Sequence, residues 1–158
     1  MDLDHLFLFT NAPEQAAEAL HRFGLTEGAP NTHPGQGTSC RRFFFRNAYL
    51  ELLTVSSEEE IKSPAIAPTR LWERSHYQQT GYSPFGLCFR SDTINFEEGW
   101  HYHPAYLPKG LYINIAPNSN YPAEPMLFEL PFSNTAPKDY PPGRQQPLLH
   151  EKGFEEIT

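Results

Sequence analysis

The feature that most constrains the fold of this chain is a pattern of secondary-structure signals that occurs twice. Its first copy opens with an alternating apolar stretch at residues 2–10, which is typical of a β-strand. A helix signal follows over residues 13–23 and ends at Gly24. Two aromatic-rich stretches at 40–47 and 48–55 then predict a pair of tightly joined strands.

A second and less regular copy begins at residue 83. Strands are predicted over 83–91, 111–117 and 126–132, with a short helix over 92–99. Ten of the 16 prolines follow residue 100, and such sequence favours short strands and long loops over helices. The chain is therefore interpreted as an internal duplication of a strand–helix–strand–strand–strand unit.

We predict a single α+β domain built from these two modules. Module one covers about residues 1–56, a linker helix covers 57–82, and module two covers about 83–132. A Pro-rich tail at 133–158 could add one edge strand. A chain of 158 residues buries about 69% of its surface on folding, which is enough for a core without disulfides.

Composition and charge exclude several classes of protein. A formal net charge of −7 lacks the basic footprint that nucleic-acid binding needs. The apolar runs are too short to span a membrane, and the acidic first residues lack the pattern of a secretory signal. Cys40 and Cys88 form no C-x-x-C pair, so we expect two buried free thiols and a cytoplasmic location.

Three ionisable residues stand inside apolar strand patterns. His5 shares a strand face with Phe7, Glu51 lies within LELL, and Glu129 lies within LFELP. A carboxylate in such a run must face solvent, find a partner, bind a cation or lose its charge. Alignment of the two copies places Glu51 over Glu129. One imidazole and two carboxylates suit Zn, Ni, Fe, Mn or Co.

The duplicated unit, together with the LDHLFLF, HPGQGT and YLELLTV segments, resembles the glyoxalase-like branch of the vicinal oxygen chelate superfamily. The resemblance covers roughly residues 2–132. It implies that two βαβββ modules curl into a cupped, eight-stranded mixed sheet with the helices outside and a small molecule or metal in the cup. In glyoxalase I, four metal ligands come from the first and last strands of the two modules.

Three of those four ligand positions carry a suitable residue in this chain. His5 and Glu51 match the first two ligands, and Glu129 matches the fourth. The third position falls on Gly86, or on Phe85 if the alignment slips by one residue, and neither residue can bind a metal. The resemblance therefore implies either a three-ligand site, a substitute ligand or a cup without metal.

Six further polar residues are predicted to line the ligand pocket: His33, Thr38, Arg42, Arg90, His101 and His103. The first two flank a glycine-containing turn that allows close approach of a ligand. An arginine in the cup would bind an anionic group such as a carboxylate. The two histidines of the H-x-H segment are the candidates for the substitute metal ligand.

These residues support two main hypotheses. In the first, His5, Glu51 and Glu129 hold a divalent metal that acts as a Lewis acid, and Glu51 or Glu129 serves as catalytic base in a lyase, isomerase or dioxygenase. In the second, the cup binds or sequesters a small molecule without metal. A third reading is an interaction domain that pairs through sheet edges, and homodimers are common in this superfamily.

Overall fold

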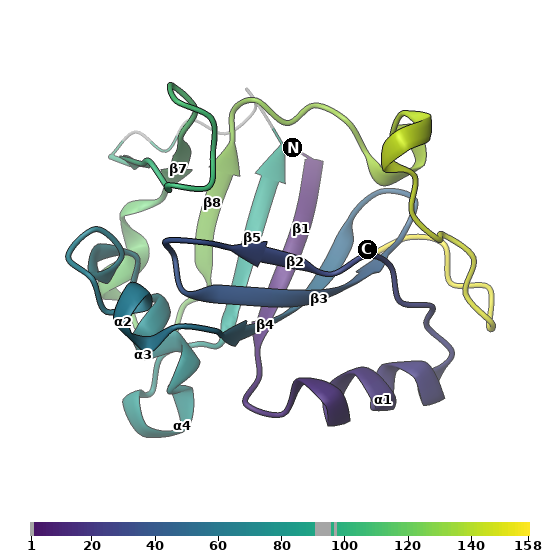
Figure 1. Ribbon diagram of the computed structural model, residues 1–158, viewed down its shortest axis with the longest axis horizontal. Helices are drawn as coiled ribbons and strands as arrows, with labels where there is room; N and C mark the ends of the chain where they lie inside the picture. Colours follow the sequence, from purple (N-terminus) through teal and green to yellow (C-terminus); the bar gives the residue numbers. More distant parts are fainter. Residues whose placement is uncertain (1, 91–95, 97) are drawn as a thin grey trace.

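The chain folds around a mixed sheet of eight strands. In chain order the strands are β1 (Asp2–Phe9), β2 (Asn31–His33), β3 (Thr38–Phe44), β4 (Tyr49–Val55), β5 (Phe85–Arg90), β6 (Trp100–Tyr102), β7 (Ile113–Ile115) and β8 (Met126–Leu130). The computed structural model describes residues 2–90, 96 and 98–158. In Figure 1, β2 and β3 cross in front of β1 and β5, because the sheet is strongly curled.

The topology of the sheet repeats the duplication of the sequence. Its strand order is β2-β3-β4-β1-β5-β8-β7-β6. In each module the first strand pairs in parallel with the last, β1 with β4 and β5 with β8. The two modules join where β1 and β5 pair in antiparallel orientation. The predicted cupped mixed sheet of the α+β class is confirmed.

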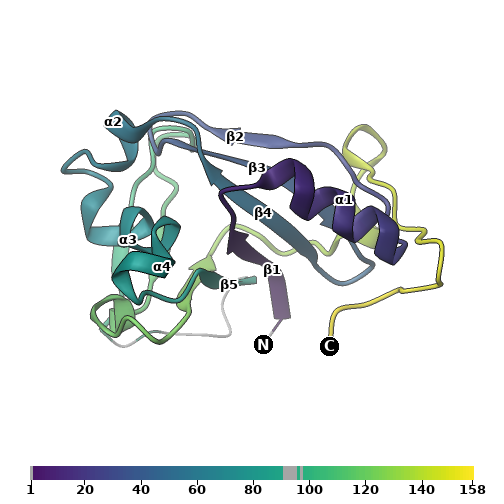
Figure 2. The ribbon, with the colours of Figure 1, turned by 90° about the horizontal axis from the view of Figure 1, so that it is seen from below.

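The helices cover the outside of module one and one end of the sheet. Helix α1 (Pro13–Phe23) lies against the outer face of module one (Figure 2), where its buried Ala17 belongs to a cluster with Phe43 and Leu52. Gly24 ends α1 with a φ of 104°, a conformation that favours glycine.

The linker is not the single helix that the sequence predicts. It contains three short α-helices, which are α2 (Glu58–Ile61), α3 (Leu71–Ser75) and α4 (Tyr77–Thr80). The helix breaks at His76, whose φ of −107° and ψ of 34° are not helical. Ser75 Oγ donates to the carbonyl of Trp72 at 2.7 Å, and side-chain bonds of this kind compete with the helical pattern.

The tail differs from its expected role as an edge strand. Residues 133–158 form two 3₁₀ turns, Pro137–Asp139 and Pro142–Arg144, and no strand. The tail instead packs against module one, where Arg46 N–H donates a hydrogen bond to the carbonyl of Glu155 at 2.8 Å. The short helix predicted over 92–99 falls largely outside the described residues.

The core has two parts, one on each face of the sheet. The inner part contains Phe7, Phe9 and Phe128 together with both cysteines, and the outer part lies beneath α1. Cys40 and Cys88 are buried and free, as predicted. Among the described residues, no helix combines the length and the apolar character that crossing a membrane requires.

Candidate functional site

A cavity of about 300 Å³ lies on the inner face of the sheet, the face that carries Phe7. Module one supplies most of the polar lining: His5, Asn31, His33, Gln36, Arg42 and Glu51. Module two and its flanks supply most of the apolar lining: Leu107, Ile113, Met126, Phe128, Leu130 and Phe132. The wall from module one is therefore mainly polar, with Phe7 and Leu53 as apolar members, and the wall from module two is mainly apolar, with the hydroxyls of Tyr102 and Tyr106 as polar groups.

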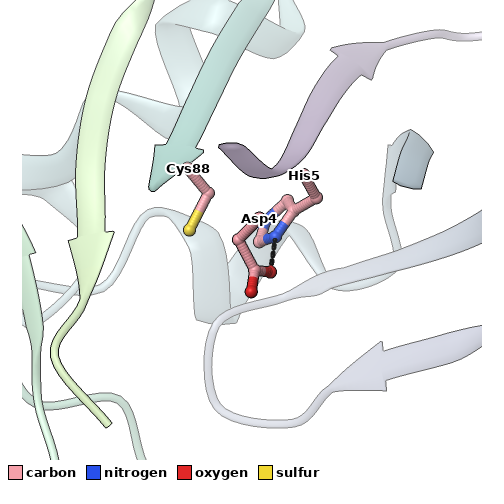
Figure 3. Close-up of side chains that lie close together, drawn as sticks. All are labelled: Asp4, His5 and Cys88. Carbon is pink, nitrogen blue, oxygen red and sulfur yellow. Dashed lines mark hydrogen bonds and ion pairs between the residues drawn. The ribbon is translucent and has the colours of Figure 1, made fainter. Parts of the chain in front are cut away.

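Adjacent residues Asp4 and His5 in β1 are both buried because the strand pairing is irregular at this point. The register of β1 against β5 shifts between Leu3 and His5, which leaves Asp4 without a partner across the sheet. One oxygen of Asp4, Oδ1, lies 2.8 Å from His5 Nδ1 (Figure 3). The other oxygen accepts a hydrogen bond from Ser133 Oγ at 2.7 Å.

The His5 ring connects Asp4 to Glu51 at the polar wall. Its Nε2 lies 3.9 Å from Glu51 Oε2, and the ring stacks on Tyr49 with centroids 4.7 Å apart. Burial disfavours the charged imidazole, but the carboxylates of Glu51 and Asp4 together raise the pKa of His5 above 6.5. The His5 and Glu51 side chains can together hold a polar group of a ligand. The Glu51 carboxylate can accept a proton from that ligand group.

The pKa of Asp4 moves in the opposite direction. Burial opposes the charge of its carboxylate, but the hydrogen bond and the charge of His5, with help from Ser133, lower this pKa below 3.8. Asp4 and His5 therefore stabilise each other in their charged forms.

A second buried group of side chains connects β2, β3 and β4 at the polar wall of the cavity. Cys40 Sγ donates to Glu51 Oε1 at 3.4 Å, and burial together with Glu51 raises the pKa of this thiol.

His33 lines the cavity and lies with its Nδ1 2.9 Å from Thr38 Oγ1. Burial lowers the pKa of His33, which favours its neutral form. Thr38 is buried behind His33 and acts on the cavity through it.

Of the predicted arginines, the structure places one in the cavity. Arg42 lines the cavity, and its Nε donates to the carbonyl of Ala29 at 2.8 Å. Arg90 is buried, but its Nη2 donates to the carbonyl of Asn47 at 2.8 Å, and it does not contribute to the cavity lining.

His101 and His103 lie away from the cavity. Both side chains are exposed, and both rings lie beside Tyr112, with the His101 ring stacked on it at 3.9 Å between centroids. In this arrangement neither histidine is in reach of His5 and Glu51, so the structure offers no support for a substitute ligand from this segment.

The structure does not bring Glu129 together with His5 and Glu51. Phe7 pairs with Glu51, and the corresponding pair in module two is Cys88 with Phe128. Phe128 lines the cavity, so Glu129 faces the other side of the sheet, where Asn114 Nδ2 donates to it at 3.4 Å. The alignment of Glu51 over Glu129 is therefore displaced by one residue.

The donors in the cup fit only half of the metal site that the resemblance implies. His5 and Glu51 are close enough to share an ion, but Gly86 and Phe128 occupy the two module-two positions. Two other groups have donor atoms within 4.8 Å of one another: Asp4, His5 and Cys88 (Figure 3), and His33, Cys40 and Glu51. Hydrogen bonds engage Asp4, His5, His33 and Cys40, and burial raises the pKa of both thiols, whereas metal binding needs thiolates.

Several residues of the site escaped the sequence analysis. Asp4 alternates out of phase with His5, and only the irregular pairing buries it beside the cavity. Gln36 accepts a hydrogen bond from Tyr102 at 3.0 Å and lies within the HPGQGT turn, where its residue type gives no signal of burial or of a partner. Arg144 lines the cavity from a tail that carries no periodic pattern.

Comparisons with known proteins agree with this architecture. The sequence model of the glyoxalase-like domain family matches residues 3–99, more than half of the chain. The protein therefore belongs to the glyoxalase-like domain family, and its resemblance to the vicinal oxygen chelate superfamily is confirmed. No curated protein sequence matches the chain.

Solved structures share the fold at low sequence identity. A methylmalonyl-CoA epimerase variant from Streptomyces coelicolor, in complex with 2-nitronate-propionyl-CoA, matches with a TM-score of 0.56, 14% identity and coverage of 85% of this chain and 98% of that one. The epimerase from Mycobacterium tuberculosis gives a TM-score of 0.54 at 12% identity, covering 82% of this chain and 86% of that one. A hypothetical protein from Bacillus halodurans gives 0.52 at 16% identity, covering 85% and 96%.

Proposed function

We propose that this protein binds a small organic molecule directly in the cavity, without a resident metal ion. The observation that carries the proposal is the division of the cavity into a polar wall from module one and an apolar wall from module two. A molecule with one polar and one apolar end matches both walls. The volume of about 300 Å³ is at the small end of the range for ligand pockets.

The metal-dependent alternative has weaker support from the residues present. A catalytic metal centre normally has three protein ligands, and the superfamily positions supply two, His5 and Glu51. A side chain at Gly86, the third metal-ligand position of the superfamily, would overlap the ring of Phe7. In this cup the Phe7 ring therefore fills the space beside that position. We therefore assign His5 and Glu51 to direct contact with the organic ligand.

Methyl NMR tests this proposal because the sequence contains two methionines and Met126 lines the cavity. Protein labelled at its methionine methyl groups and treated with chelator is titrated with indole, benzyl alcohol and 3-phenylpropionate. We expect at least one compound to shift the Met126 signal saturably, with a Kd of about 1 mM. The Met126→Leu variant identifies the signal.

Two tryptophan variants locate the binding site. Leu130→Trp fills the cavity and should abolish the shift of Met126, whereas Leu149→Trp, at a side chain that is 88% exposed, should leave it unchanged. Thermal melts of both variants verify that they fold. If no compound shifts Met126, or if Leu130→Trp binds as well as the unmodified protein, direct binding in this cavity is wrong.

A further inference from the structure

Two arginines line the cavity and have no carboxylate partner among the residues that the structure describes. Within the described part of the chain, ion pairs with carboxylates join Arg22, Arg41, Arg70 and Lys62, but neither Arg42 nor Arg144 forms one. Arg42 and Arg144 are the lysine or arginine side chains that line the first cavity among the described residues. Unpaired cations that line a pocket are what recognition of an anion requires.

The guanidinium of Arg42 is fixed in place by module one. Its Nε and Nη2 donate to the carbonyls of Ala29 and Pro30 at 2.8 and 3.3 Å. Its Cζ lies 5.0 Å from the ring centroid of Phe44 and 5.8 Å from that of Tyr49. These contacts orient the positive charge before a ligand arrives, which lowers the entropic cost of binding.

Arg144 reaches the cavity from the tail, beyond the residues that the family model matches. Both ring nitrogens of His150 anchor the tail to module one. His150 Nδ1 accepts a hydrogen bond from Thr26 N–H, and His150 Nε2 donates to the carbonyl of Phe44, each at 3.0 Å. The Arg144 guanidinium lies 4.9 Å from the ring centroid of Tyr140. The tail therefore brings a cation to a site that the two modules build.

Arg144 lies where two cavities meet. A second cavity of about 210 Å³ shares Tyr49, Leu130, Phe132 and Arg144 with the first. Tyr49 lies beneath Arg42, with 5.8 Å between the Arg42 Cζ and the ring centroid, and Tyr49 and Arg144 both line the two cavities. A ligand whose apolar body fills the first cavity can thus place its acidic group between Arg42 and Arg144.

The charges around the two cavities favour a single negative charge on the ligand. Arg42 and Arg144 share the lining of these cavities with carboxyl groups, that of Glu51 in the first cavity and that of Asp4 in the second. The two carboxylates would repel a dianion, such as a phosphate monoester, more strongly than a monoanion.

We propose that Arg42 and Arg144 bind the carboxylate of an amphipathic monocarboxylic acid whose apolar body lies against the wall formed by Met126, Phe128 and Leu130. This inference rests on the proposed function and names its ligand class. An apolar cavity of about 150 Å³ holds a benzene molecule, so about 300 Å³ accommodates roughly twelve non-hydrogen atoms.

Isothermal titration calorimetry with matched probes tests this assignment. We expect 3-phenylpropionate to bind about tenfold more tightly than its neutral isostere 3-phenylpropanamide, because a charge-assisted hydrogen bond is lost in the amide. The dianion 2-phenylethyl phosphate should bind more weakly than the carboxylate.

Arg144→Gln provides the decisive variant, because this side chain is exposed and forms no hydrogen bond within the described residues. It should reduce affinity for the carboxylate about tenfold and leave affinity for the amide unchanged. Arg22→Gln, at an exposed position on α1, is the matched control and should change neither affinity.

The outcomes separate this inference from the proposed function. Equal binding of acid and amide, or an equal loss of both in Arg144→Gln, overturns carboxylate recognition while direct binding in the cavity stands. Tighter binding of the phosphate overturns the choice of a monocarboxylate. Failure of both acid and amide to bind, with indole still shifting Met126, overturns the inference alone, and failure of all probes overturns both.

Discussion

Replacement of Asp4 by alanine is expected to lower the free energy of unfolding by about 3 kcal/mol, because it removes one member of a buried charged pair and leaves His5 with only the more distant carboxylate of Glu51, at 3.9 Å. The variant deprives His5 of its partner at 2.8 Å and leaves the hydroxyl of Ser133 without its acceptor. For a chain of this length the melting temperature should fall by about 6–12 °C. Thermal and urea unfolding of both proteins measure the loss.

The loss should depend on pH in a defined direction. The pKa of Asp4 is lowered from 3.8, so its stabilising contribution is present above that pH and is lost as the pH falls through the lowered value. The pKa of His5 is raised from 6.5, so its contribution is complete below pH 6.5 and is lost as the pH rises through the raised value. The stability difference should therefore be largest between about pH 4 and 6.5.

Asp139→Ala is the matched control for this prediction. Asp139 is exposed in the tail, and its replacement should change stability by less than about 0.5 kcal/mol at any pH. A loss in Asp4→Ala that is the same below about pH 4, between pH 4 and 6.5, and well above pH 6.5 would show that the buried charges of Asp4 and His5 are not coupled.

Replacement of Gly86 by alanine is expected to destabilise the protein by about 3 kcal/mol. The new methyl group would overlap the ring of Phe7, which is itself buried in the inner core. Because the neighbour is a packed aromatic ring and not the end of a flexible side chain, it cannot move aside freely. The same overlap with Phe7 means that a metal-binding histidine at position 86 would require the cup to repack.

A second substitution tests the cause of that loss. Phe7→Leu in the Gly86→Ala background should recover part of the stability, so that the double variant loses less than the sum of the single variants. Gly143→Ala is the control, since no atom lies within 4 Å of an added methyl group there, and its stability should be unchanged or slightly raised. Additive losses in the double variant would remove Phe7 as the cause.

The fold was predictable because the duplication leaves its mark on strand and helix periodicity. The positions of His5 and Glu51 on the cavity wall were predictable from strand periodicity, since each residue interrupts an apolar strand that one face of the sheet buries. Glu129 was misplaced because matching Glu51 to Glu129 by residue type ignores strand register. A shift of one residue moves a side chain to the opposite face of a sheet.

Other parts of the site carry no local signal. The burial of Asp4 depends on an irregularity between two strands that are more than eighty residues apart, and alternation alone places it on the wrong face. Arg144 belongs to a tail whose path is set by single hydrogen bonds to module one, such as that from His150 to Phe44. The periodicity of a single sequence therefore predicts neither the burial of Asp4 nor the position of Arg144.

The metal content of the purified protein distinguishes direct binding of the organic ligand in the cup from binding through a resident metal ion. The protein is prepared without a histidine tag or chelator and compared with His5→Ala. We predict a content of transition metal far below stoichiometric in both, and no thermal stabilisation when Zn, Ni, Mn, Fe or Co is added. A stoichiometric metal in the unmodified protein that is lost in His5→Ala would contradict the account.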